Sequence, residues 1–236
     1  MAPIGAAEYA ERAKAAYARA QGAGADVVVL FDDQYIQYFT GFVFSPTERP
    51  IALIVGPGGE RALFVPLLEL EHAEALADVD RVVAYPEYPG EVHPLELLLR
   101  EVRRLGVGRR TIAVDHDGYP PVMGYAPVKL GELAGLGTSS FSVALDEQMA
   151  RKSEHEVALV RESARWGAYA HRLLQAGTEP GLTEDAVVGA AWAAATRAMN
   201  ESFGVPYRQR NKWVRGALAI YRGQIGPAGA FPHALA

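Results

Sequence analysis

Two apolar runs on either side of a glycine-rich turn constrain the fold of this chain more than any other feature. Residues 51–55 read Ile-Ala-Leu-Ile-Val, residues 61–65 read Arg-Ala-Leu-Phe-Val, and Gly-Pro-Gly-Gly-Glu lies between them. Apolar runs joined by a short turn that contains glycine are typical of a β-hairpin. The pattern therefore predicts two antiparallel strands, whose apolar side chains require helices or further strands to cover them.

Strands and helices are expected to alternate around this hairpin. The run Asp26–Phe31 is rich in β-branched residues, as in a strand buried on both faces. Two further short strands are predicted at 82–85 and 111–115. Polar and apolar residues at helical spacing, with glycine, aspartate or proline at the ends, predict helices over 6–21, 33–39, 70–76 and 94–105. Together these elements predict an α/β fold in which helices flank a mixed sheet.

A domain boundary is expected near Asp146, which divides the chain into residues 1–146 and 147–236. Residues 139–144 are predicted to form the last strand before it. Beyond it, Ser153 and Glu156 have the spacing of a capping box, which predicts the start of a long helix that ends near Ala176. Thr183 is predicted to cap a second helix, from Glu184 to about Met199.

Composition narrows the classes of function. The 236 residues carry a net charge of −5, so no general affinity for nucleic acid or for an anionic membrane is expected. Cysteine is absent from the sequence, which excludes thiol nucleophiles, disulfides and zinc–thiolate sites within it. The first residues do not have the pattern of a signal peptide, and no apolar run is long enough to span a bilayer. A cytoplasmic protein is the expectation.

Five short motifs follow one another along the chain: Tyr35–Phe42, Glu48-Arg49-Pro50, Arg151–Glu156, Gly177–Glu184 and Gly229–His233. In this order and spacing they resemble the family of Xaa-Pro peptidases (prolidase and aminopeptidase P) and creatinase. The resemblance implies a creatinase-type N-terminal domain over residues 1–146, followed by the truncated start of an α+β pita-bread domain over 147–236, with a strand from Ala217 to Tyr221.

The last motif lies close to the end of the chain, at Ala236. In a full-length peptidase of this family, two divalent metal ions (Mn, Co or Zn) are held by two aspartates, a histidine and two glutamates, all of which follow the Pro-His segment. The resemblance therefore implies the front part of an enzyme with no metal site in this chain. We expect such a chain to be inactive by itself and its rear part to be incompletely packed.

The resemblance assigns roles to two residues. His233 matches a histidine that faces the substrate and assists proton movement in the peptidases, or that is the main acid–base group in creatinase. The alternative for His233 is an exposed terminal histidine. Arg49 matches an arginine that, in the creatinase branch of the family, reaches into the neighbouring subunit of a homodimer and binds the substrate carboxylate. The alternative for Arg49 is a residue that orders its own loop by pairing with Glu48 or with nearby carbonyl groups.

Three functions are compatible with this reading. The first is metal-dependent hydrolysis of the peptide bond next to proline in a dipeptide or peptide. The second is metal-free hydrolysis of a small guanidino compound, driven by His233 with carboxylates. The third is a non-catalytic remnant that dimerises. Asp115-His116-Asp117 has the composition of a metal site, but its place between a strand and a Gly-Tyr-Pro-Pro turn favours turn chemistry.

Overall fold

The computed structural model describes residues 4–86, 91–105, 111–121, 126–204 and 215–221, together with Gly226 and Ala230. The chain divides into two compact units between Lys152 and Ser153. Asp146, where the boundary was expected, lies inside helix α6 (Ser142–Ala150), and this helix belongs to the front unit.

A six-stranded mixed sheet forms the centre of the front unit. Its strand order is β4-β3-β2-β1-β5-β6, and β2 is antiparallel to both of its neighbours while the remaining pairs are parallel. The carboxyl ends of the other five strands therefore share one edge of the sheet with the amino end of β2. The predicted hairpin and mixed sheet are confirmed. The strands are β1 (Ala25–Leu30), β2 (Ala52–Val55), β3 (Arg61–Pro66), β4 (Arg81–Tyr85), β5 (Thr111–Val114) and β6 (Thr138–Ser140).

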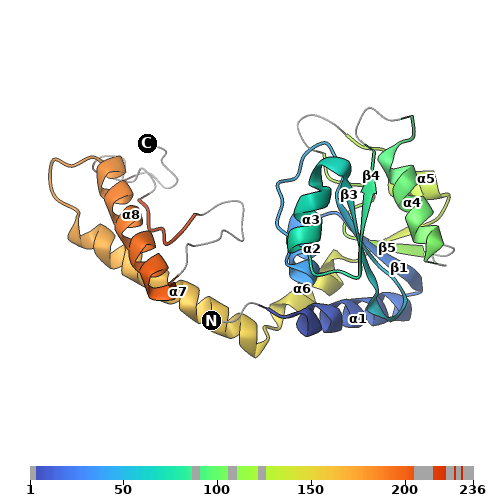
Figure 1. Ribbon diagram of the computed structural model, residues 1–236, viewed down its shortest axis with the longest axis horizontal. Helices are drawn as coiled ribbons and strands as arrows, with labels where there is room; N and C mark the ends of the chain where they lie inside the picture. The colour runs from blue at the N-terminus through green and yellow to red at the C-terminus, as the bar shows by residue number, and fades with distance from the viewer. Residues whose placement is uncertain are drawn as a thin grey trace. The chain divides into compact units, whose positions relative to one another are not determined.

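Helices cover both faces of this sheet (Figure 1). Neighbouring residues of β1 show why both faces need cover, since Val28 packs into one core, Val29 packs into the other, and both are fully buried. Alternate side chains of a strand point to opposite faces. The first core is closed by α1 (Ala6–Gly22), α2 (Asp33–Thr40), α3 (Leu70–Leu76) and α6, and the second by α4 (Pro94–Arg104) and α5 (Leu130–Ala134).

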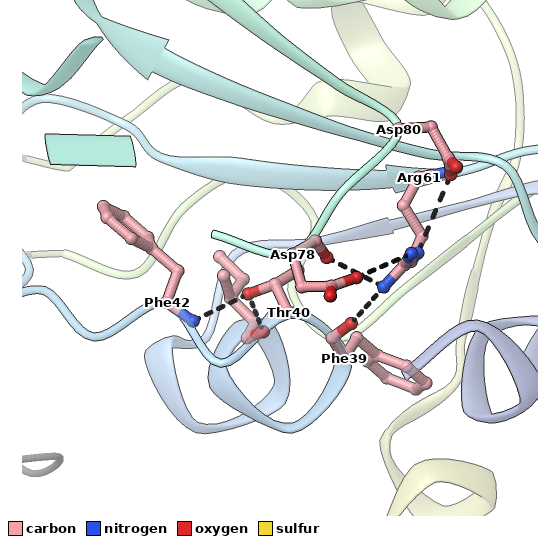
Figure 2. A network of polar contacts seen from close by, with 7 residues as sticks. Phe39, Thr40, Phe42, Arg61, Asp78 and Asp80 are labelled. Atoms are coloured by element: carbon pink, nitrogen blue, oxygen red, sulfur yellow. Dashed lines mark hydrogen bonds and ion pairs between the residues drawn. The ribbon is translucent and has the colours of Figure 1, made fainter. Parts of the chain in front are cut away.

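A buried arginine ties the end of α2 to the strands β3 and β4 (Figure 2). Arg61 is 4% exposed, and its Nη1 donates to the carbonyl oxygens of Phe39 at 3.1 Å and Asp78 at 2.8 Å. Its Nη2 donates to Asp78 Oδ1 at 3.1 Å, and its backbone N–H donates to Asp80 Oδ2 at 2.7 Å. Asp78 in turn donates its backbone N–H to the carbonyl of Thr40 at 2.8 Å. One guanidinium thus satisfies carbonyl groups that the strands and helices leave unpaired.

The prediction of a strand over 139–144 was wrong beyond Ser140. Phe141 and Leu145 pack into the first core, and a helix from Ser142 places both side chains there. Polar contacts also fix this helix to its neighbours, because Tyr35 Oη of α2 donates to Asp146 Oδ1 at 2.8 Å and Gln148 Nε2 donates to the carbonyl of Arg12 in α1 at 3.0 Å. Packing against the front unit overrides the apolar character that suggested a strand.

Two long helices, α7 (Glu154–Ala176) and α8 (Glu184–Phe203), form the described part of the rear unit with residues 215–221. The predicted capping box is confirmed: Ser153 Oγ accepts from the Glu156 backbone N–H at 3.1 Å, and Glu156 Oε2 accepts from the Ser153 N–H at 2.8 Å. Thr183 caps α8 as predicted. None of the described helices combines the length and the apolar character needed to cross a membrane.

Residues 215–221 do not form the strand that the resemblance implied from Ala217. Gly216 has a φ of +109°, which extended L-residues do not adopt, and a side chain there would meet Thr196. The Ala217 N–H donates to Thr196 Oγ1 at 3.1 Å, and the Tyr221 hydroxyl hydrogen-bonds Thr178 Oγ1 at 2.8 Å. Contacts with side chains of the rear unit thus replace a strand ladder over this segment.

Candidate functional site

The loop that leads from α2 into β2 brings Arg49 to the carboxyl edge of the sheet. Gly41 ends α2 in the left-handed conformation, with a φ of 69°, and the chain then runs to Ala52, where β2 begins. Ligands of open α/β sheets bind outside the carboxyl ends of the strands, which is this edge. The position of Arg49 therefore suits a residue that contacts a ligand.

A small cavity of about 30 Å³ lies beside Arg49. Its lining comes from the loop before β2, the end of β4, the start of α4 and the turn after β5. A volume of this size holds about one water molecule and is far too small for a dipeptide. Any substrate contact of Arg49 must therefore occur at the rim of this cavity. The lining residues are Glu48, Arg49, Pro50, Tyr85, His93, Pro94 and Tyr119.

Arg49 is ion-paired in the structure. Its Nη1 donates to Glu48 Oε1 at 2.5 Å, and its backbone N–H donates to Thr47 Oγ1 at 3.2 Å. The side chains of Arg49 and Glu48 are 30% and 31% exposed. The loop-ordering contact that sequence reasoning held as the alternative is thus present. A substrate carboxylate would have to share the guanidinium with Glu48 or replace it.

Two residues that the sequence analysis did not single out shape this site. Tyr85 is 2% exposed, its ring stacks on Phe64 with a centroid distance of 4.7 Å, and its hydroxyl donates to the Pro50 carbonyl at 3.0 Å. His93 caps α4, because its Nδ1 accepts from the Leu95 N–H at 3.1 Å. The sequence did offer a signal for both residues in their positions. Tyr85 ends a predicted strand, and His93 precedes the proline that opens a predicted helix.

Asp115 uses its carboxylate to order the backbone. It accepts hydrogen bonds from the N–H groups of Phe31, Asp32 and His116 at distances of 2.7–3.0 Å. Burial raises the pKa of Asp115, and these donors act in the opposite direction. Asp117 Oδ1 likewise accepts from the Gly131 N–H at 2.8 Å. Both carboxylates thus bind backbone N–H groups, most of them on distant segments, so they tie neighbouring parts of the front unit together rather than serving the turn alone. Among the residues that the structure describes, no three His, Asp or Glu side chains are grouped so that they could hold a metal ion.

His233 lies outside the described residues. Of the two predicted site residues, Arg49 is the one whose surroundings the structure describes. Its role toward a substrate stays a prediction.

The chain is similar to known proteins over the front unit and part of the rear unit. Residues 12–126 match the family model of the Creatinase/Prolidase N-terminal domain. An Xaa-Pro dipeptidase from Lactobacillus delbrueckii subsp. lactis is 29% identical over 169 residues, which cover 70% of this chain and 44% of that protein. The aligned part is longer than the front unit, so the similarity extends into the rear unit.

Solved structures share the fold. The dipeptidase PepE from Mycobacterium ulcerans matches with a TM-score of 0.64 and 23% identity, over 83% of this chain and 51% of that one. An Xaa-Pro dipeptidase from Bacillus anthracis matches with a TM-score of 0.61 and 16% identity, over 82% and 50%. The chain thus spans about half the length of these proteins. The mixed sheet with helices on both faces, together with the matched sequence, identifies residues 12–126 as a creatinase/prolidase N-terminal domain.

Proposed function

We propose that this chain belongs to an Xaa-Pro dipeptidase, an enzyme that hydrolyses the peptide bond before proline in a dipeptide. The observation that carries the proposal is the extent of the similarity to the Lactobacillus delbrueckii enzyme, which runs beyond the creatinase/prolidase N-terminal domain and into the rear unit. An N-terminal domain alone would leave the chemistry open, because one fold supports many functions.

Arg49 is proposed to bind the carboxylate of the substrate from a neighbouring subunit of a homodimer. Its guanidinium sits at the edge of the sheet where ligands of α/β folds bind, and the side chain is only partly buried. A planar guanidinium binds a carboxylate through two parallel hydrogen bonds, which a lysine ammonium does not reproduce. Glu48 keeps the charge compensated until a substrate carboxylate takes its place.

His233 is proposed to move a proton between the substrate and water. A histidine suits this task because its unperturbed pKa lies near neutral pH. The two divalent metal ions expected of a full-length peptidase do not fit the described residues, where no suitable group of ligands is present. We assign their ligands to residues outside the described ones.

The test is hydrolysis of glycyl-proline and, separately, of creatine by a full-length protein that contains residues 1–236, with and without added manganese. We expect manganese-dependent cleavage of glycyl-proline and no cleavage of creatine. Metal-free cleavage of creatine would favour the creatinase branch, and no hydrolysis of either compound would favour a non-catalytic protein. Residues 1–236 alone serve as the control. Manganese-dependent cleavage by that sample would show that these residues contain a metal site of their own.

Two substitutions in the full-length protein test the assigned residues. Arg49→Lys keeps the charge and removes the two-pronged contact, so we expect KM to rise by an amount equivalent to roughly 1.5–3 kcal/mol with little change in kcat. His233→Ala should instead lower kcat by about 10²–10⁴-fold. An unchanged KM for the first variant, or an unchanged kcat for the second, would remove that residue from the site.

A further inference from the structure

We infer that Tyr85 is a positioning residue, whose hydroxyl fixes the backbone of the Arg49 loop through the carbonyl of Pro50. The inference rests on the proposed function, because it concerns how Arg49 is presented to a substrate. Tyr85 ends strand β4, whereas Arg49 and Pro50 precede β2, two strands away in the sheet. The contact therefore joins two segments that the strand ladder does not join directly.

The side chain of Tyr85 is held rigidly in the second core. Tyr85 is 2% exposed, and its ring stacks on Phe64 of the adjacent strand at 4.7 Å with an interplanar angle of 19°. Phe64 is itself 1% exposed, and it pairs with Ala52 in the ladder between β2 and β3. A buried ring between packed neighbours cannot change rotamer without opening the core. The hydroxyl oxygen is thus a fixed point at the carboxyl edge of the sheet.

Pro50, whose carbonyl accepts the hydrogen bond from Tyr85, restricts the position of Arg49, the residue before it. Pro50 is buried and has no N–H, so its carbonyl is its one backbone group that can form a hydrogen bond. Tyr85 Oη donates to that carbonyl at 3.0 Å. The proline ring fixes φ of Pro50, and a residue that precedes proline is confined to extended conformations. Holding the carbonyl of Pro50 therefore restricts where the Cα of Arg49 can lie.

Loss of the hydroxyl would leave the buried carbonyl without this donor. An unsatisfied buried carbonyl is unfavourable, and the loop relieves it by moving toward water. Arg49, which is half-buried beside Glu48, would move with the loop. A purely structural role for Tyr85 would show itself in the stability of the front unit. A positioning role shows itself in the exchange of loop amides and in KM.

The test compares Tyr85→Phe, which removes the hydroxyl and keeps the ring on Phe64, with Tyr17→Phe. Tyr17 is a partly buried tyrosine of α1 that packs against the first core, on the opposite face of the sheet from Tyr85, so it serves as the control. In residues 1–236 we expect hydrogen exchange of the Arg49 and Ile51 amides to accelerate about 10-fold in Tyr85→Phe and to stay unchanged in Tyr17→Phe. In the full-length enzyme we expect KM for glycyl-proline to rise about 3- to 10-fold at unchanged kcat, as for loss of one hydrogen bond.

Unchanged exchange of the Arg49 and Ile51 amides in Tyr85→Phe would overturn the inference, whatever the kinetics. So would faster exchange with an unchanged KM, provided that Arg49→Lys does raise KM. An Arg49→Lys variant with unchanged KM would instead overturn the proposed role of Arg49. The failure of the proposed function and the failure of this inference are thus separate results.

Discussion

The two units of the chain bury different kinds of residue. In the front unit, the sheet separates two cores of large side chains, and Phe39, Phe64 and Leu98 are among those with almost no exposed surface. In the described part of the rear unit, the buried residues are mostly small, as Ala170 and Ala195 illustrate, and Trp192 and Phe203 remain 39% and 38% exposed. The comparison teaches that the front unit is held by non-local packing, whereas local signals define the rear helices.

The local signals in the rear unit are explicit. Both long helices begin with a side-chain cap, at Ser153 and Thr183, and acidic residues occupy their first turns. The 23-residue helix α7 has two buried residues, Ala170 and Leu174. In such helices, the caps and the interaction of acidic side chains with the helix dipole contribute to stability alongside burial.

The largest expected effect on stability comes from truncating one buried leucine to alanine in each unit. Leu63 and Leu174 are both buried, at 0% and 1% exposure. Leu63→Ala should lower the free energy of unfolding of the front unit by about 2–5 kcal/mol, because it leaves a cavity between β-strands and helices. Leu174→Ala should leave the front unit unchanged if the units unfold independently.

The chain allows the two transitions to be followed separately. Its three tryptophans, Trp166, Trp192 and Trp213, all follow residue 153, so tryptophan fluorescence reports on the rear unit. Amide exchange of the sheet residues reports on the front unit. Equal loss of sheet protection in Leu63→Ala and Leu174→Ala would show that the units unfold as one.

The next effect concerns the buried arginine of the front unit. Arg61→Met removes the donor to the carbonyls of Phe39 and Asp78, and we expect a loss of about 1–3 kcal/mol in the free energy of unfolding. The control is Arg104→Met, because Arg104 is 52% exposed and its ion pair with Glu101 is at the surface. That variant should change stability by less than about 1 kcal/mol. Similar values for the two arginines, from denaturant unfolding, would contradict a structural role of the network in Figure 2.

A smaller effect is expected when a cap is removed from the rear unit. Ser153→Ala abolishes the capping box of α7 and should destabilise the rear unit by about 1 kcal/mol, with no effect on sheet amides. Ser163→Ala, at an exposed position inside the same helix, should be neutral or slightly stabilising. Fluorescence-detected unfolding measures both. Equal effects of the two substitutions would mean that the cap does not define this helix.

The smallest effect is a pH dependence in the front unit. Burial, with the hydrogen bond to Asp146, raises the pKa of Tyr35 to about 12 from its ordinary value of 10.0. A group whose folded pKa is raised stabilises the fold below its unfolded pKa, and that contribution is lost as pH rises through the folded pKa. Wild-type stability should therefore decline between pH 10 and 12, and Tyr35→Phe should decline less. Denaturant titrations at pH 9 and pH 11.5 compare them, and parallel declines would exclude Tyr35 as the source.

Much of the fold was predictable because its signals are local. The hairpin, the Thr183 cap of α8 and the Ser153 capping box each depend on a few adjacent residues, and the structure confirms them. The prediction of a strand over 139–144 failed beyond Ser140 because Phe141 and Leu145 are apolar in either conformation, and only packing against the first core decides between them. For the site, the family resemblance singled out Arg49, and the ion pair with Glu48 was foreseen as the alternative. The hold of Tyr85 on Pro50 was not foreseen, because these residues are far apart in the sequence.

The sequence by itself determined most of the helices and strands, their order and the caps of the two long rear helices, because periodicity, turn residues and capping side chains act within a few residues of each other. The tertiary structure decided which strands lie side by side, with β2 alone reversed, and where the front unit ends. It also decided which polar groups meet: Arg61 with the carbonyls of α2 and of the segment before β4, and Tyr85 with the loop of Arg49. Such contacts satisfy buried carbonyl groups whose need for a partner arises only once the chain has folded.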